Sequence, residues 1–227
     1  MFPIFDLPSP NFNERRLPVD MIVLHYTGMR TFDEALRRLT DPSAQVGAHY
    51  AVSKSGDVFR LVDEEKRAWH AGVSYWRGIT DTNSRSIGIE IENAGHEYGY
   101  APFPETQMES VVELCRDIIK RRPIIPAVNI VGHSDVAPTR KTDPGELFPW
   151  RFLAENGIGL WTDGFAPSEK TAREMLAGIG YDATDESAAY KAFARRFFPA
   201  DLTGKSERGI QRLAAVSALY ERQDAGK

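Results

Sequence analysis

Residues 86–92 alternate strictly between apolar and polar side chains, and this short pattern constrains the fold more than any other feature of the sequence. Successive side chains of a β-strand point to opposite faces of the sheet. The isoleucines Ile87, Ile89 and Ile91 therefore share one face, whereas the polar side chains, among them Glu90, share the other. The pattern predicts a β-strand with a buried face.

Four further segments predict strands. Residues 21–26 are a short apolar run of the kind found in buried strands. Residues 49–53 and 57–62 flank the turn sequence Lys54-Ser-Gly, and this arrangement predicts a hairpin. Residues 128–131 predict another short strand.

Two helices are predicted between these strands. The sequence Thr31-Phe-Asp-Glu is a capping box, and it predicts a short helix that ends near Asp41. Residues 105–122 place apolar side chains at the i, i+3, i+4, i+7 spacing of an amphipathic helix. Pro123 then ends this second helix, because proline cannot continue the hydrogen-bond pattern.

Three segments show no regular period. Residues 1–20, which are rich in proline and asparagine, are expected to form an extended arm on the surface. Residues 64–85 are polar and aromatic, and they predict a long loop of functional character. Residues 132–150 predict an irregular stretch that is dense in polar residues and prolines.

The composition changes near Trp161. Residues 168–223 predict three helices and no strand, with Ser168 and Thr184 as candidate N-caps. A small core for these helices would come from apolar side chains such as Phe193 and Phe197.

These patterns together predict an α/β protein with two domains. Residues 1–160 would form a mixed central β-sheet flanked by helices, because strand and helix patterns follow one another along this part of the chain. Residues 168–227 would form a small three-helix domain. The boundary is expected at about 160–167.

Charge and cysteine content exclude several classes of protein. The net charge of -4 gives no electrostatic footprint for nucleic acid, and no basic cluster is typical of a membrane-surface patch. Cys115 is the single cysteine of the sequence, so neither an internal disulfide nor a zinc finger can form. No apolar run approaches the roughly 20 residues of a membrane span. We expect a monomer.

The first ten residues lack the basic region and the long apolar run of a signal peptide. We therefore expect a cytoplasmic protein. A chain whose leader had been removed would begin in the same way, and its location would then be periplasmic.

Three polar residues lie at positions where they could share a metal ion. His25 and His133 each close a predicted strand, and Asp143 follows His133 in a loop rich in proline and glycine. Two imidazoles and one carboxylate suit Zn²⁺ and leave a fourth position for water, as in catalytic zinc sites. Taken singly, each residue is also explained as an ordinary polar residue at a strand end or turn.

Five segments resemble the type-2 N-acetylmuramoyl-L-alanine amidases, in the order and spacing of that family, between about residues 8 and 160. They are residues 25–28, 67–72, 86–90, 132–138 and 140–145. The resemblance implies hydrolysis of the amide between the lactyl group of N-acetylmuramic (or anhydro-muramic) acid and L-alanine, in cell-wall recycling or turnover. It implies peptidoglycan fragments as the partner.

The family's catalytic positions fall on residues of this sequence. The zinc ligands fall on His25, His133 and Asp143, the catalytic glutamate on Glu90, and a lysine that donates to the oxyanion on Lys141. A carboxylate near zinc can act as general base and then as general acid. Without the resemblance, Glu90 would be a solvated strand residue and Lys141 a surface lysine.

One position separates two branches of the family. Relatives of the phage-lysozyme type have a tyrosine before the hairpin histidine and lack the glutamate, whereas this sequence has Ala48 and Glu90. The sequence therefore resembles the glutamate-using branch, which includes the AmpD and AmiD enzymes. His49 is then expected to be a packed histidine, and His96 a loop residue.

The resemblance also implies a substrate groove. Trp69, His70 and Asn83 match segments that line it, and Tyr26 follows a metal ligand. Trp69 could stack on a sugar, while His70 and Asn83 could hydrogen-bond the peptide. The alternatives are a core tryptophan and polar residues that cap loops.

Two alternatives remain open at this stage. The segment 180–213 resembles a three-helix peptidoglycan-binding domain, but it could equally be a stabilising helical extension. The whole protein could also be a peptidoglycan-recognition module without catalysis, although all five site residues are present. An unrelated zinc peptidase is disfavoured because the sequence has no His-Glu-x-x-His motif.

Overall fold

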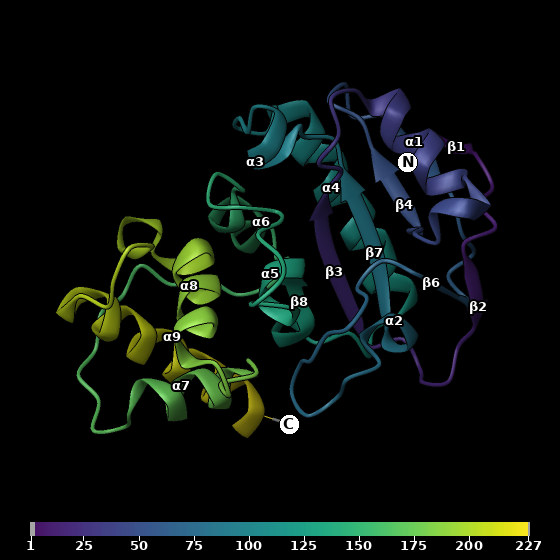
Figure 1. Ribbon diagram of the computed structural model, residues 1–227. Coiled ribbons are helices and arrows are strands. Elements are labelled where there is room, and N and C mark those ends of the chain that lie inside the picture. The colour runs from purple at the N-terminus through teal and green to yellow at the C-terminus, as the bar shows by residue number, and fades with distance from the viewer. Residues whose placement is uncertain (1–2, 227) are drawn as a thin grey trace.

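The predicted mixed β-sheet forms the centre of the protein, and it has six strands (Figure 1). The computed structural model describes residues 3–226. Neighbouring strands follow the order β1 (Ile4–Asp6), β5 (Val58–Arg60), β4 (Tyr50–Val52), β7 (Ser86–Ile91), β3 (Met21–Tyr26) and β8 (Ile130–Gly132). Strands β4, β7, β3 and β8 run parallel, whereas β4 and β5 form the predicted antiparallel hairpin.

The register of β3 against β7 places two of the candidate site residues side by side. His25 pairs with Glu90 across the two strands, directly beyond the buried pair Leu24 and Ile89. Paired residues on neighbouring strands point to the same face of a sheet. The imidazole and the carboxylate are therefore brought to one face at the carboxyl ends of two parallel strands.

The isoleucine face of β7 packs on helix α4 (Glu105–Arg121). Ile87, Ile89 and Ile91 are fully buried there against α4 side chains such as Val111 and Ile118. This contact confirms the two periods predicted from the sequence, one for the strand and one for the helix. The opposite face of the sheet is left for the site and for other helices.

The other helices surround this core (Figure 1). Helix α1 (Phe32–Thr40) begins at Thr31, whose hydroxyl accepts a hydrogen bond from the Glu34 backbone, as predicted. The remaining α-helices of the described chain are α2 (Thr82–Arg85), α3 (Gly95–Tyr98), α5 (His133–Val136), α6 (Trp150–Glu155), α7 (Ala172–Ile179), α8 (Glu186–Phe197) and α9 (Glu207–Ala225). Short 3₁₀ turns span Pro42–Ala44, Ala127–Asn129 and Pro199–Asp201.

The C-terminal helices α7, α8 and α9 pack at the β8 side of the sheet (Figure 1). Their buried side chains, among them Leu176 and Phe193, join one apolar cluster with Met21, Val23 and Val131 of the sheet. Residues 160–167 contain neither helix nor strand. The C-terminal helices therefore share a core with β3 and β8.

A buried ion pair crosses this contact. Arg196 of α8 donates to the Asp135 carboxylate over 3.0 Å and to the Ile130 carbonyl over 3.1 Å. The Tyr181 hydroxyl donates to the other oxygen of Asp135 over 2.7 Å. Because Asp135 belongs to α5, the C-terminal helices are bonded directly to the element that begins with His133.

Three predictions of irregular structure were incomplete. The N-terminal arm contains β1 and also β2 (Phe12–Glu14), which pairs with β6 (Lys66–Ala68) inside the predicted long loop. The same loop ends in α2, and the stretch after β8 begins with α5. Strands of three residues and helices of four are too short to give a recognisable period.

Both candidate N-caps in the C-terminal region were wrong, the first by three residues and the second by one. Thr171, not Ser168, caps α7, because its hydroxyl accepts from the Glu174 backbone while Glu174 accepts from Thr171. Asp185, not Thr184, caps α8 by accepting from the Ala188 backbone over 3.0 Å. Within residues 3–226, no helix combines the length and apolar character that a membrane crossing requires.

Candidate metal centre and active-site pocket

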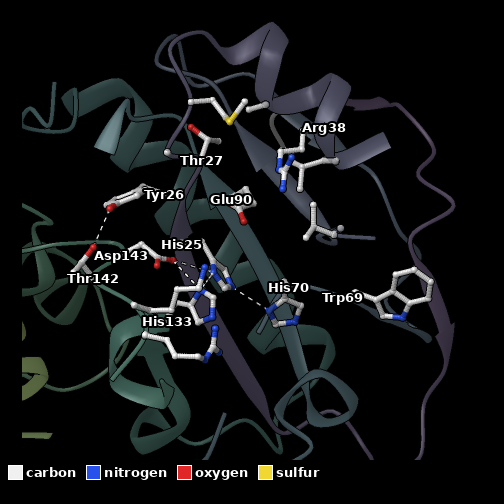
Figure 2. A pocket seen from close by; sticks show the side chains of 18 residues that line it. His25, Tyr26, Thr27, Arg38, Trp69, His70, Glu90, His133, Thr142 and Asp143 are labelled. Atoms are coloured by element: carbon white, nitrogen blue, oxygen red, sulfur yellow. Dashed lines mark hydrogen bonds and ion pairs between the residues drawn. The ribbon is translucent and has the colours of Figure 1, made fainter. Parts of the chain in front are cut away.

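Three buried side chains converge at the carboxyl end of the sheet (Figure 2). His25 lies near the end of β3, His133 begins α5 directly after β8, and Asp143 comes from the following loop. Nδ1 of His25 lies 2.9 Å from Nδ1 of His133. Oδ2 of Asp143 lies 3.1 Å from each of these nitrogens. Three donor atoms in one tight triangle could hold a metal ion.

The protonation of His133 is fixed by a main-chain contact. Its Nε2 lies 3.0 Å from the carbonyl oxygen of Ala71. A carbonyl oxygen accepts hydrogen bonds only, so Nε2 carries the proton and Nδ1 presents a lone pair. His133 therefore turns its basic nitrogen toward His25 and Asp143.

The protonation of His25 is fixed by a chain of three hydrogen bonds. The Ser86 hydroxyl donates to the Thr82 carbonyl over 2.6 Å, so the Ser86 oxygen accepts from Nε2 of His70 at 3.2 Å. A neutral His70 then has its lone pair on Nδ1, which lies 3.0 Å from Nε2 of His25. His25 donates to His70, and its own Nδ1 presents a lone pair.

The electrostatics of the cluster favour a neutral His25 ring and an ionised Asp143. Burial, followed by the neighbouring His133, lowers the pKa of His25 to about 4. Burial raises the pKa of Asp143, but His133 and His25 outweigh burial and hold it below its usual range. At neutral pH the His25 ring is therefore neutral and Asp143 is a carboxylate, the protonation states in which each can bind a metal ion.

Glu90 lies on the same side of the sheet as these three residues (Figure 2). Burial, followed by the charge of Asp143, raises its pKa well above the usual range, while Lys141 opposes the shift. Its Oε2 atom is buried and has no hydrogen-bond partner among the described residues. A buried acceptor without a partner is costly, so this oxygen is available to a ligand or a cation in the pocket.

The cluster lies at the base of a pocket of about 380 Å³. Its walls come from the end of β3, from α1, from the segment around Val46 and Gly47, and from the 140–143 loop. The sequence-predicted site residues that line it are His25, Tyr26, Trp69, His70, Glu90, His133, Lys141 and Asp143. A substrate bound in this pocket would therefore contact both the triangle and Glu90.

Tyr26 and Trp69 point to different sides of the pocket (Figure 2). The Tyr26 hydroxyl lies 3.0 Å from Oγ1 of Thr142 and 3.0 Å from Nδ1 of His96. The Trp69 ring nitrogen donates to Oδ1 of Asn13 over 3.0 Å. His96 belongs to α3, so its prediction as a loop residue was wrong.

Asn83 does not line the pocket. Its side-chain oxygen accepts hydrogen bonds from the backbone of His70 and Ala71, at 3.1 and 2.7 Å. This bond pair holds the loop that supplies His70. His49 is also remote from the triangle; it is fully buried and accepts from the Gly88 backbone over 2.9 Å, as expected of a packed histidine.

Two supporting residues were not recognised in the sequence. Arg140 donates to the Ala71 carbonyl over 2.9 Å and also to the Val73 carbonyl, and so joins the two loops that flank the site. Gly88 lies under the His70 ring, where an added Cβ would come within 2.4 Å of Cγ. In the sequence, a glycine on the polar face of an otherwise regular strand was the signal that another group packs closely against this position.

Comparison with known proteins agrees with this geometry. Residues 15–146 match the family model described as N-acetylmuramoyl-L-alanine amidase. The chain is 38% identical to N-acetylmuramoyl-L-alanine amidase AmiD of Escherichia coli, over 90% of this chain and 83% of that protein. It is 34% identical to 1,6-anhydro-N-acetylmuramyl-L-alanine amidase AmpD of Haemophilus influenzae, over 65% of this chain and 89% of that protein.

A solved structure shares the fold over nearly the whole chain. The complex of AmiD from E. coli with anhydro-N-acetylmuramic acid-L-Ala-D-gamma-Glu-L-Lys superimposes with a TM-score of 0.79 at 36% identity. The match covers 94% of this chain and 90% of that one. The similarity therefore includes the C-terminal helices as well as the sheet.

Proposed function

The chain belongs to the N-acetylmuramoyl-L-alanine amidase family, and from this premise we propose that it is a zinc-dependent hydrolase of muropeptides. The bond cleaved would be the amide between the lactyl group of muramic acid and L-alanine. The observation that carries the proposal is the buried triangle of His25, His133 and Asp143 with Glu90 in the same pocket.

Zinc is the metal that fits this donor set best. Ligand atoms at about 2.0–2.1 Å from a tetrahedral zinc ion lie about 3.3 Å apart, and the three donor atoms here lie 2.9–3.1 Å apart. Both rings already present the unprotonated nitrogen that coordination needs. When bound, the ion would supply Lewis-acid polarisation of the scissile carbonyl and would acidify a water molecule at its open position.

Glu90 is proposed as the proton carrier of the reaction. As a carboxylate it would accept a proton from the attacking water and then donate it to the departing amine of L-alanine. Burial raises its pKa, and this favours the protonated form that the second step uses. The unpartnered Oε2 gives the attacking water an acceptor inside the pocket.

Lys141 is proposed as a donor to the developing oxyanion. It lines the same pocket and lies two positions before Asp143, so its ammonium group and the metal ligand come from one loop. A fixed cation beside a developing negative charge stabilises the transition state more than the ground state.

Substrate contact is proposed for Tyr26 and Trp69. Trp69 offers a ring face of the kind that stacks on a sugar, and Tyr26 carries a hydroxyl at the opposite side of the metal ligands. His70 and Asn83 are not proposed to contact the substrate, because their polar side-chain atoms already form hydrogen bonds within the protein. They hold His25 and the 69–72 loop in place.

Anhydro-muropeptides are the proposed substrate, which would place the enzyme in cell-wall recycling. The AmpD relative is named for the 1,6-anhydro sugar, and the AmiD structure holds an anhydro-muramoyl tripeptide. The alternative is a non-catalytic recognition module. The complete set of ligands, proton carrier and lysine in one pocket favours hydrolysis.

One assay tests the proposal. Zinc-loaded protein is incubated with anhydro-muramoyl tripeptide and, separately, with intact sacculi, and released peptide is measured by mass spectrometry. Tripeptide should appear, chelator should stop its release, and added zinc should restore it. A protein that binds the muropeptide but releases no peptide would instead be a recognition module.

A further inference from the structure

A second groove opens beside the metal site. It is about 380 Å³ in volume and shares Arg140, Lys141 and Thr142 with the main pocket. One wall is the 138–142 loop, and the other is a single face of helix α8, which packs beside α5 (Figure 1). A ligand held at the metal ligands can therefore pass Lys141 into this groove.

The groove is cationic in a protein whose net charge is -4. Its lining includes four basic residues and only one acidic residue, Asp185. The basic residues are Arg140, Lys141, Lys191 and Arg195. The Asp185 carboxylate is already used to cap α8. The positive character of the groove is therefore a local arrangement and does not follow from overall composition.

Two of these cations, Lys141 and Lys191, have no ion-pair partner among the described residues. Across residues 3–226, no carboxylate lies within ion-pair distance of Lys141 or Lys191. Ion pairs are formed instead by lysines on the open surface, namely Lys54, Lys66, Lys170 and Lys205. Nε of Arg195 is buried without a hydrogen bond, and its nearest carboxylate, Glu146, is 3.8 Å away. The groove thus offers two lysine ammonium groups that no carboxylate of the described residues neutralises.

We propose that this groove binds the carboxylate groups of the stem peptide, so that helix α8 completes the substrate site. The inference rests on the proposed function and extends it to the peptide side of the substrate. A γ-linked glutamate, as in the tripeptide bound to AmiD, keeps its α-carboxylate free. That carboxylate follows L-alanine immediately, so it lies close to the cleaved bond.

The lining of the two cavities supports this orientation. No aromatic side chain lines the second groove, whereas Trp69 and Tyr26 line the main pocket. Sugars are bound through stacking on aromatic rings, and carboxylates through cations. The aromatic side chains therefore favour the main pocket for the sugar, and Lys191 and Arg195, which line only the groove, favour the groove for the acidic peptide.

Binding measurements on the E90Q protein test the inference without turnover. The two ligands are anhydro-muramoyl-L-Ala-γ-D-Glu-L-Lys and the same molecule with its glutamate α-carboxylate amidated. The variants are Lys191→Ala and Lys191→Glu, and the matched control is Lys120→Ala on α4, an exposed lysine far from the groove. Dissociation constants are measured by calorimetry at low and high salt.

The free acid should bind the E90Q protein more tightly than the amide does. Lys191→Ala should weaken binding of the acid about three-fold and Lys191→Glu about ten-fold, with smaller effects at high salt. Neither variant should change binding of the amide, and Lys120→Ala should change neither ligand. Equal losses for both ligands, no loss in Lys191→Glu, or no binding of either ligand would overturn the inference.

The same experiment separates this inference from the proposed function. If the wild-type protein releases no peptide but binding still depends on the carboxylate and on Lys191, the hydrolytic function fails while the groove stands. If peptide is released but amidation and Lys191 make no difference to binding, the groove fails and the hydrolase stands.

Discussion

Nε2 of His25 lies 3.0 Å from Nδ1 of His70, so one buried histidine orients another that is proposed to bind zinc. His70 is held in turn by Ser86. This contact leaves the neutral His70 ring a single hydrogen-bonding pattern. Residues that orient a metal ligand in this way typically contribute a factor of about 10–100 to metal affinity.

His70→Ala should therefore weaken zinc binding by about 10–100-fold while the protein remains folded. The measurement is a zinc titration of the metal-free protein against a competing chelator, with circular dichroism to check folding. His96→Ala is the matched control, because His96 is a partly exposed histidine that does not line the pocket. Unchanged zinc affinity in His70→Ala would contradict the orienting role, and nitrogen chemical shifts of the His25 ring would report the tautomer directly.

Zinc binding should stabilise the folded protein, because the three ligands are brought together by folding. At a free zinc concentration 1,000 times the dissociation constant, the gain in unfolding free energy is about 4 kcal/mol. The melting temperature should rise on addition of zinc and fall again with chelator. Asp143→Ala should abolish this rise, and a rise of full size in that variant would remove Asp143 from the ligand set.

Glu90→Gln should lower kcat by about 10²–10⁴-fold and leave zinc binding intact, since glutamine keeps the shape but cannot carry the proton. Glu92→Gln is the matched control, one residue beyond the end of the same strand. Glu92 accepts a hydrogen bond from the Lys54 backbone and does not line the pocket. A Glu90→Gln protein with near-normal kcat would assign the proton transfer to another group.

The strands that carry the site were predictable because each has a strong local signal. Alternation at residues 86–92 places Glu90 on the polar face, and the apolar run ending at His25 gives the neighbouring strand. The pairing of His25 with Glu90 was not predictable from either pattern, because register is set by contacts between distant segments. The structure supplies that register.

Other parts of the site depend on contacts that leave no periodic trace. Asn83 resembled a groove residue, yet its side chain bonds the backbone of His70 and Ala71. Arg140 acts through carbonyl groups of a loop almost 70 positions away in sequence. Single side-chain to backbone bonds of this kind are tertiary features, and local propensity does not encode them.

Arg196→Met should lower the free energy of unfolding by about 3–5 kcal/mol, because it leaves the buried Asp135 carboxylate without its cation. The loss should be largely recovered in the double variant with Asp135→Asn, in a double-mutant cycle measured by urea denaturation. Arg151→Met, which breaks exposed pairs with Glu155 and Asp163, should cost less than about 1 kcal/mol. Equal, small effects of both variants would show that the Arg196–Asp135 pair between α8 and α5 does not contribute to the free energy of unfolding.

Glu64 should make the protein sensitive to acid. Its carboxylate is buried and accepts hydrogen bonds from Tyr50, Arg121 and Arg122 at 2.7–2.9 Å. Burial raises the pKa of Glu64, but these hydrogen bonds and the charge of Arg121 outweigh burial and lower the pKa to about 2. The folded state therefore holds the proton less tightly than the unfolded state, in which glutamate titrates near 4.5.

Because the folded pKa is the lower one, the stability that Glu64 contributes is complete above about pH 4.5 and is lost as the pH falls toward about 2. Glu64→Gln should lower the unfolding free energy at pH 7 by about 3 kcal/mol, since two arginines lose their carboxylate. Urea denaturation at pH 7, 4.5 and 3 should show this gap between variant and wild type closing as the pH falls. Glu113→Gln, at an exposed position of α4, should change the unfolding free energy by less than about 0.5 kcal/mol at pH 7. A gap that stays constant down to pH 3 would mean that the Glu64 carboxylate is not what the arginines stabilise.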